Sequence, residues 1–192
     1  MPDIDLSLEV AKHVEEMRKA GGWPSDEALN RLAAQIASGF KAKKDEVAIL
    51  RLLADGRTLS FLFPIKLSKV GLIPLSVAHS LAAKTIRDKR GEIVNNFSGY
   101  KHASVFEAVD LSAGEKAAPI QKIVSAPMIT DGKVVGVIEV SRKGKPGEPI
   151  GPDFTPRDLS ELATVGAILG KLLATLPAAA PAPPKPAPPA KR

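Results

Sequence analysis

The sequence predicts an α/β fold of the α+β sandwich type, in which an antiparallel sheet is flanked by helices. Two observations carry this prediction. Pairs of β-rich runs are joined twice by an Asp-Gly turn, which favours antiparallel hairpins, and helical patterns precede and follow these runs. Composition divides the 192 residues into an N-terminal helical segment at 1–42, a sheet-containing domain at 43–176 and a disordered Pro/Ala-rich tail at 177–192.

The first forty residues carry two helical patterns. In the first, Val10, Val14 and Met17 recur at helical spacing, and a Gly-Gly pair ends the helix. The second helix begins at Ser25, a natural N-cap. Its apolar stripe comprises Leu29, Leu32, Ala33, Ile36 and Phe40.

Two further residues of this segment have chemistry of their own. His13 lies among Glu15 and Glu16, so we expect it on the surface. Trp23 stands in the connection between the two helices, which we expect it to anchor by packing.

A central strand is predicted at 45–54, because this run is apolar on both faces except for Arg51. Asp55-Gly56 then turns the chain into a second strand at 58–64. A cation on such a strand has two interpretations. Either Arg51 forms a salt bridge at the strand end, or it points into a pocket as a ligand-binding residue.

The middle of the chain predicts a helix at 76–90 and a short strand at 92–95. A polar, Gly- and Ser-containing stretch follows at 96–119, with one candidate helical turn around Phe106. A connection this long inside a compact domain is usually functional or mobile.

The clearest hairpin joins runs 121–130 and 133–142 through Asp131-Gly132. A Gly/Pro-rich loop then leads to Thr155, a natural N-cap for the last helix. Residues on this helix alternate by three and four, as in a heptad seam. They form either a dimer interface or a face packed on the domain's own sheet: Leu159, Leu162, Gly166, Leu169 and Leu173.

The order of these motifs resembles a GAF domain over residues 43–176. GAF domains end with a strand closing on a Pro, a "vGvIel" strand, an "FtxxD" loop and a terminal helix. Here Ala126-Pro127-Met128, Gly136-Val137-Ile138-Glu139-Val140 and Phe154-Thr155 with Asp158 follow in that order. The resemblance implies a sensory or dimerising module built on an antiparallel sheet.

Several GAF branches carry diagnostic residues that this chain lacks. Bilin attachment and methionine-sulfoxide reduction both use cysteine, and the chain has none. The cyclic-nucleotide branch carries an Asn-Lys…Phe…Asp-Glu signature, whereas this chain has Asn95-Asn96-Phe97 without the acidic pair. Haem would need a histidine, and we expect His79 to be a packed or hydrogen-bonded helix residue instead. We therefore predict no cofactor.

In GAF domains, the loop that corresponds to residues 97–106 commonly covers the ligand cavity. The resemblance implies that Tyr100 and Phe106 stack on a ligand, while Lys101 and His102 meet an anion. The alternative is a solvated surface loop with one aromatic anchor.

Composition excludes several classes of protein. Without cysteine there is no disulfide framework, thiolate metal site or thiol nucleophile, and the three histidines are scattered. No catalytic motif or nucleotide-cradling loop is present, so we predict no catalytic residue and no metal site. The N-terminus is no signal peptide, and the longest apolar helical stretch is interrupted by polar residues, so we expect a cytoplasmic protein without membrane association.

The net charge is +6, and Lys185, Lys191 and Arg192 of the tail supply three of these charges. Acidic residues are interspersed among the basic ones, and aromatic residues make up only 4% of the chain, which argues against nucleic-acid binding.

These observations together predict a non-enzymatic regulatory or sensory module in signal transduction. It would bind an unidentified small molecule, an unidentified partner protein or both. The alternatives are a ligand-free scaffold that acts as a homodimer, and a basic nucleic-acid-associated protein.

Overall fold

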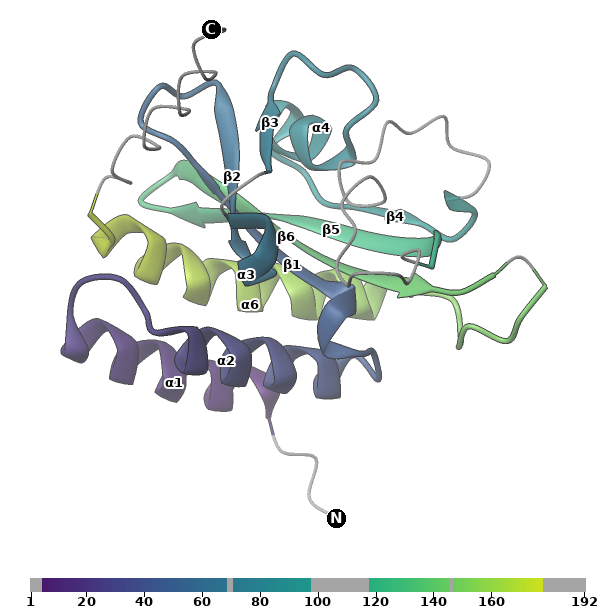
Figure 1. Cartoon of the computed structure of the whole chain (residues 1–192), viewed down its shortest axis with the longest axis horizontal. Helices are drawn as coiled ribbons and strands as arrows, with labels where there is room; N and C mark the ends of the chain where they lie inside the picture. Colours follow the sequence, from purple (N-terminus) through teal and green to yellow (C-terminus); the bar gives the residue numbers. More distant parts are fainter. Residues whose placement is uncertain (1–4, 69–70, 98–117, 146, 178–192) are drawn as a thin grey trace, which may run out of the picture.

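Six strands form one antiparallel sheet in the order β3-β2-β1-β6-β5-β4 (Figure 1). The computed structural model describes residues 5–68, 71–97, 118–145 and 147–177. The strands are β1 (Val47–Leu52), β2 (Thr58–Phe63), β3 (Leu72–Pro74), β4 (Glu92–Val94), β5 (Ile120–Thr130) and β6 (Lys133–Lys143). This sheet confirms the α+β sandwich class, and both predicted hairpins are present.

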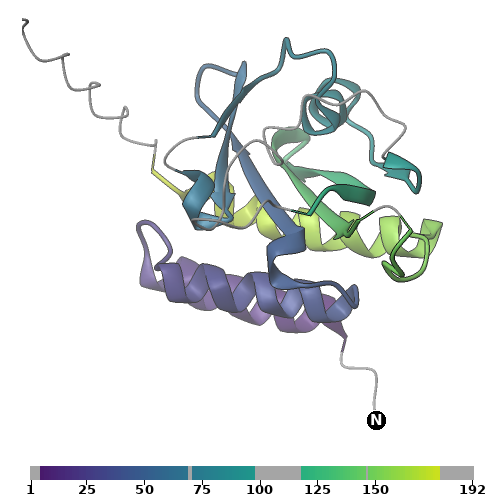
Figure 2. The same cartoon turned by 45° about the vertical axis from the view of Figure 1, so that its right-hand side comes forward.

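Helices cover both faces of the sheet (Figure 2). They are α1 (Leu6–Ala20), α2 (Asp26–Gly39), α3 (Ile65–Ser68), α4 (Leu81–Asp88) and α6 (Pro156–Thr175), with a 3₁₀ turn, η1 (Lys44–Glu46), before β1. Helix α6 packs along β5 and β6, α1 and α2 lie on that same side, and α4 lies on the opposite face. Among the described residues, no helix is long and apolar enough to span a membrane.

The main apolar core lies between one face of the sheet and α1, α2 and α6. Val10 of α1, Ile36 of α2, Ile49 of β1 and Leu169 of α6 all belong to this one buried cluster. The N-terminal helices therefore share a hydrophobic core with the sheet. The domain boundary near residue 42 stays a prediction.

The β5–β6 hairpin supplies two long strands near the centre of the sheet. Asp131 and Gly132 both take left-handed backbone conformations, with φ of 49° and 72°, as a tight two-residue hairpin requires. Further along β6, a Cβ atom on Gly136 would lie 2.2 Å from the backbone oxygen of Leu50. Only glycine allows β1 and β6 to approach this closely.

Some local expectations were wrong. The helix predicted at 76–90 begins only at Leu81, because the Ser80 side chain accepts a hydrogen bond from the Ala83 N–H and caps it there. His79 therefore precedes the helix and is exposed. His13 is buried instead of exposed, because α2 packs against α1 and places Gln35 Oε1 3.0 Å from His13 Nδ1.

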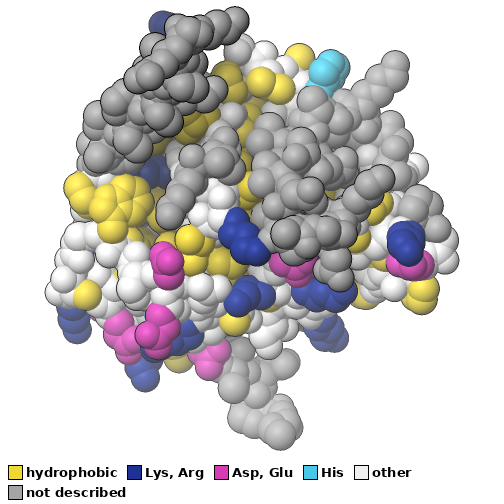
Figure 3. Space-filling view, viewed as in Figure 1, with side chains coloured by type: hydrophobic (Ala, Val, Ile, Leu, Met, Phe, Trp, Pro, Cys, Tyr) yellow, Lys and Arg dark blue, Asp and Glu magenta, His cyan; other side chains and the backbone are white. Residues whose placement is uncertain are grey.

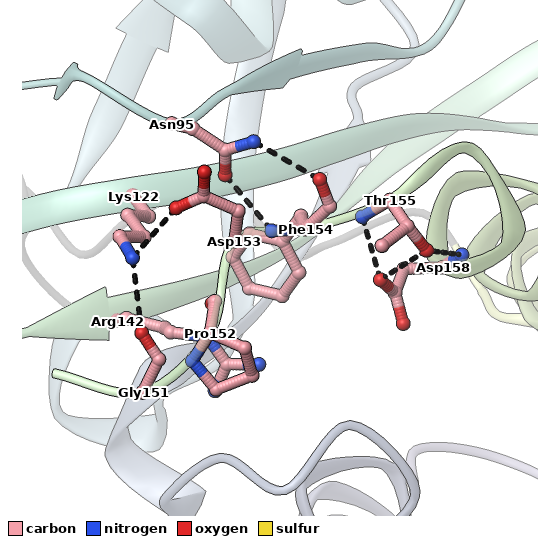
Figure 4. Close-up of polar contacts among 9 residues, drawn as sticks. All are labelled: Asn95, Lys122, Arg142, Gly151, Pro152, Asp153, Phe154, Thr155 and Asp158. Atoms are coloured by element: carbon pink, nitrogen blue, oxygen red, sulfur yellow. Dashed lines mark hydrogen bonds and ion pairs between the residues drawn. The ribbon is translucent and has the colours of Figure 1, made fainter.

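The loop between β6 and α6 is fixed by side chains from the sheet (Figure 4). The Asn95 amide after β4 donates to the Phe154 carbonyl at 3.0 Å and accepts from the Phe154 N–H at 2.9 Å. Lys122 of β5 pairs with Asp153 at 2.7 Å. Arg142 of β6 stacks on the Phe154 ring at 4.5 Å from its centroid. Asn95 therefore holds this loop against the end of β4.

The N-cap predicted at Thr155 is confirmed, and Asp158 completes a capping box. The Thr155 hydroxyl accepts from the Asp158 N–H at 3.3 Å, and the Thr155 N–H donates to the Asp158 carboxylate at 2.6 Å. Figure 4 shows both contacts at the start of α6. The cap and the tethered loop together set the position of α6 on the sheet.

Candidate functional site

The apolar core on the α4 side of the sheet is divided into two clusters among the described residues. One cluster joins β1, β2 and β6 to α4 and includes Val137 and Ile86. The other joins β5 to the start of α4 and includes Ile123 and Leu81. The opposite face of the sheet carries a single cluster, so this division is specific to the α4 side.

A group of polar side chains lies between these two clusters. Glu139 of β6 has Ser125 of β5 directly opposite on one side and Ala48 of β1 on the other. The Ser125 hydroxyl hydrogen-bonds the Glu139 carboxylate. Thr85 of α4 approaches from above the sheet, with Oγ1 2.8 Å from Ser125 Oγ. We call Glu139, Ser125 and Thr85 the polar triplet.

All three side chains of the polar triplet are buried, and Glu139 is only 6% exposed. Its Oε1 atom has no hydrogen-bond partner within the described part of the chain. An unpaired polar atom removed from water costs free energy, so such atoms are rare in folded proteins and call for an explanation.

Burial raises the pKa of Glu139 to about 7, because the ionised form loses its hydration. The hydrogen bond from Ser125 opposes this effect and lowers the pKa, but it is the smaller of the two causes. The carboxyl therefore changes its charge near neutral pH.

The alternation of a β-strand explains why Glu139 reaches this position. Side chains of β6 point alternately to the two faces, so Ile138 and Val140 enter the main core while Val137 and Glu139 face α4. In the sequence, Glu139 stands out only as part of the GAF-like motif at 136–140. The overlooked signal was a lone acidic residue within the apolar run 134–140 of a central strand.

Arg51 does not join the polar triplet. Its guanidinium donates to the carbonyl of Pro177 at 2.7 Å and to that of Leu176 at 3.2 Å, at the end of α6. It also lies over the Trp23 ring, 5.4 Å from the centroid. Arg51 thus has a structural contact, but its partners are two backbone carbonyls at a helix end and not the carboxylate that a salt bridge requires. Its role in ligand binding stays a prediction. Trp23, itself 46% exposed, anchors the α1–α2 connection through its contact with Arg51.

The other predicted ligand-binding residues lie outside the described residues. These are Tyr100, Lys101, His102 and Phe106, together with the candidate helical turn in that stretch. Their role in ligand binding stays a prediction.

The predicted dimer seam on α6 points into the chain's own core. Leu162, Gly166, Leu169 and Leu173 are buried, and Leu159 packs against the same cluster. The exposed positions between Ser160 and Thr175 are instead Ala163, Thr164, Ala167, Lys171 and Ala174, and only one of them is charged. Association of two copies through α6 would use this second face.

Charged side chains of both signs are interspersed on the face of the molecule drawn in Figure 3. Figure 3 shows Lys and Arg side chains beside Asp and Glu side chains over the lower part of this face. Lys84 pairs with Glu92, and Lys122 pairs with Asp153. No group of three His, Cys, Asp or Glu side chains that could hold a metal ion occurs among the described residues.

A scan against protein-family models gives no match, and neither does a search of curated protein sequences. Solved structures do match. The GAF domain of an Acinetobacter phosphoenolpyruvate-protein phosphotransferase has a TM-score of 0.63 and 19% identity, over 91% of this chain and 95% of that chain. A methyl-accepting chemotaxis protein segment has a TM-score of 0.60 and 16% identity, over 86% of this chain and 94% of that chain.

A third similar structure belongs to an enzyme. Free methionine-R-sulfoxide reductase from Neisseria meningitidis, solved with its substrate, has a TM-score of 0.59 and 13% identity, over 88% of this chain and 87% of that chain. Identities this low establish the fold rather than the activity. The chain therefore has the GAF fold, as its motif order predicts.

Proposed function

We propose that this chain is a non-enzymatic sensory or regulatory module that binds a small molecule on the α4 side of its sheet. The observation that carries this proposal is the unpartnered Oε1 of the buried Glu139. A ligand group that hydrogen-bonds this atom removes the cost of leaving it unpaired.

Two further observations support this location. The apolar core on the α4 side is split at the polar triplet, and a few polar groups between apolar walls are typical of ligand sites. Phe97 belongs to one of these apolar clusters, and the stretch that carries Tyr100, Lys101, His102 and Phe106 follows it directly in the sequence. We keep these four residues as proposed contributors to binding: the two aromatic rings would pack on the ligand body, and Lys101 and His102 would meet an anionic group of the ligand away from Glu139.

The non-enzymatic part of the proposal depends on the chemistry available. The similar reductase is named for sulfoxide reduction, and the chain has no cysteine to supply a thiol for such a step. The polar triplet offers a carboxyl and two hydroxyls, which suffice for reversible binding. Similar structures from a phosphotransferase and a chemotaxis protein support a regulatory role.

A thermal-shift screen of the full chain against a metabolite library tests this function. Because a ligand that binds only the folded state stabilises it by about 3 kcal/mol at a hundred times its Kd, a true ligand raises Tm measurably. A structure of the complex must then place the ligand against the polar triplet. If no metabolite raises Tm, or the ligand lies elsewhere, the proposed function is wrong.

A second candidate function is association of two copies into a scaffold. It is favoured by the outward face of α6, where small side chains surround the single charge of Lys171. Light scattering with wild type and Ala167→Glu tests it, because a buried glutamate would separate the copies. A monomer at every concentration rules out this candidate.

A further inference from the structure

The unpartnered Oε1 atom of Glu139 indicates which kind of ligand group can hydrogen-bond to it. In its ionised form, which predominates above pH 7, the carboxylate oxygen accepts hydrogen bonds and cannot donate them. The Ser125 hydroxyl of β5 donates a hydrogen bond to the Glu139 carboxylate, and the Thr85 hydroxyl can donate to Ser125. The two hydroxyls therefore form a short chain of hydrogen bonds that ends on Glu139. This chain of donors stabilises the ionised carboxylate and leaves Oε1 available.

No described residue supplies the missing donor or a counter-charge. Ala48 of β1, which lies opposite Glu139, has only a methyl group as its side chain. Val137, the preceding residue on the same face of β6 as Glu139, is also apolar. A buried carboxylate without a positive partner is costly, because the low dielectric of the interior strengthens every unpaired charge.

Charged groups on the elements packed against Glu139 either have other partners or, like Lys133 of β6, are exposed. Two lysines form ion pairs: Lys122 of β5 with Asp153, and Lys84 of α4 with Glu92. Lys143 of β6 donates to the Asp45 carbonyl. Three arginines donate to backbone carbonyls: Arg51 of β1 to Leu176 and Pro177, Arg87 of α4 to Leu75, and Arg142 of β6 to Phe40, Lys41 and Pro152. The Glu46 carboxylate of η1 accepts from the backbone N–H groups of Lys43 and Lys143. Asp88 of α4 is exposed, and the charged residues of α6 lie across the sheet.

We propose that the ligand is a small organic cation, whose protonated amine or amidine group donates to Glu139 Oε1 and supplies its counter-charge. This inference rests on the proposed function and names the ligand class for the same site. A charge-assisted hydrogen bond between an ammonium group and a carboxylate is about twice as strong as a neutral one. The flanking clusters, with Val137 and Ile86 on one side and Ile123 and Leu81 on the other, suit a short apolar body.

The charge state of Glu139 makes this ligand class testable through pH. In the ligand-free protein the pKa of Glu139 is about 7, and an amine stays protonated well above pH 7. Binding a cation to the ionised carboxylate lowers the pKa of Glu139 and releases a proton. Affinity for an amine therefore rises as the pH rises through 7.

Isothermal titration of the full-length chain tests the proposal with isobutylamine, isoamylamine and agmatine as probes. The matched neutral probes are isobutanol and isoamyl alcohol, and isovalerate is the anionic match. We expect at least one amine to bind, with an affinity about tenfold higher at about pH 8 than at about pH 6, and to release protons at the lower pH. The alcohols and isovalerate should bind more weakly than the amines.

Glu139→Gln should lower the affinity for the amine at least about tenfold, because the amide keeps the shape and loses the charge. Glu161→Gln on α6, across the sheet, is the matched control and should leave the affinity unchanged. The pH measurement uses wild-type protein, so the test stands even if Glu139→Gln fails to fold.

The outcomes separate this inference from the proposed function. If a neutral or anionic metabolite binds against the polar triplet while the amines do not, the ligand class is wrong and the proposed function stands. If amine affinity is independent of pH and of Glu139→Gln, the ligand class is wrong, and the proposed function stands only if a library metabolite binds against the polar triplet. If neither the amines nor any library metabolite binds, both are wrong.

Discussion

Ser125 of β5 lies directly opposite Glu139 of β6, and its hydroxyl hydrogen-bonds the glutamate carboxylate in the interior of the protein. Thr85 of α4 joins the same group through Ser125. The second carboxylate oxygen has no partner among the described residues. Among the described residues, this arrangement places a titratable group between the two apolar clusters on the α4 side.

The raised pKa of Glu139 makes stability depend on pH in a defined direction. Between its ordinary value of 4.5 and its folded value of about 7, the folded protein binds a proton that the unfolded chain has released. The free energy of unfolding therefore falls by about 3 kcal/mol as the pH rises through this window, and this contribution levels off above 7. Urea denaturation across the pH range should show this slope in wild type and lack it in Glu139→Gln. Glu161→Gln should keep it, and parallel profiles for wild type and Glu139→Gln would contradict the placement of the carboxyl.

Arg51 fastens the end of α6 to β1. Arg51→Ala removes two hydrogen bonds to the Leu176 and Pro177 carbonyls and the contact with Trp23, so we expect a loss of about 2 kcal/mol in the free energy of unfolding. Arg57→Ala is the control, because Arg57 lies exposed in the β1–β2 turn. An equal effect of the two variants on the urea midpoint would show that Arg51 has no such role.

Gly136 permits the close contact between β1 and β6. In Gly136→Ala the new methyl group would meet the Leu50 backbone oxygen, which cannot move aside without breaking the sheet. We expect a loss of about 3 kcal/mol or more. Gly166→Ala on α6 is the matched control: its Cβ would lie 3.2 Å from the Pro127 oxygen, and alanine favours the helix, so the net change should stay below about 1 kcal/mol. Thermal unfolding followed by circular dichroism distinguishes the two variants, and similar midpoints would refute the argument.

The N-terminal helices belong to the core that holds α6 on the sheet. Removing residues 1–42 takes away buried side chains such as Val10, Leu32 and Ile36 and exposes their apolar partners to water. We expect the shortened chain to aggregate or to lose its cooperative unfolding transition. A soluble fragment with a cooperative transition near that of the full chain would show instead that residues 43–176 fold alone.

The fold followed from signals that are local in the sequence. The Asp131-Gly132 turn, the Thr155 cap and the helical stripe around Leu32 each depend on neighbouring residues, so each was predictable. The start of α4 was predicted too early, because an apolar pattern does not reveal which serine caps a helix. His13 was misplaced for a related reason, because its burial depends on a second helix.

The candidate site was only partly predictable because its members come from three separate elements. Thr85, Ser125 and Glu139 are ordinary residues in their own segments, and only strand register and the position of α4 bring them together. Arg51 was singled out correctly as unusual, but the sequence left two interpretations open. Its actual partners, the carbonyls at the end of α6, lie more than a hundred positions away along the chain.

The titration of the Glu139 side chain tests the central claim most directly, because the proposed site depends on a buried carboxyl that the protein leaves unpaired. The chemical shift of its ¹³Cδ carboxyl carbon can be followed by NMR across the pH range in the ligand-free full chain, and Glu139→Gln assigns the signal. The account predicts a midpoint near the pKa of about 7. A midpoint near the ordinary value of 4.5 would mean that water or a protein cation reaches the carboxylate, and would contradict the account.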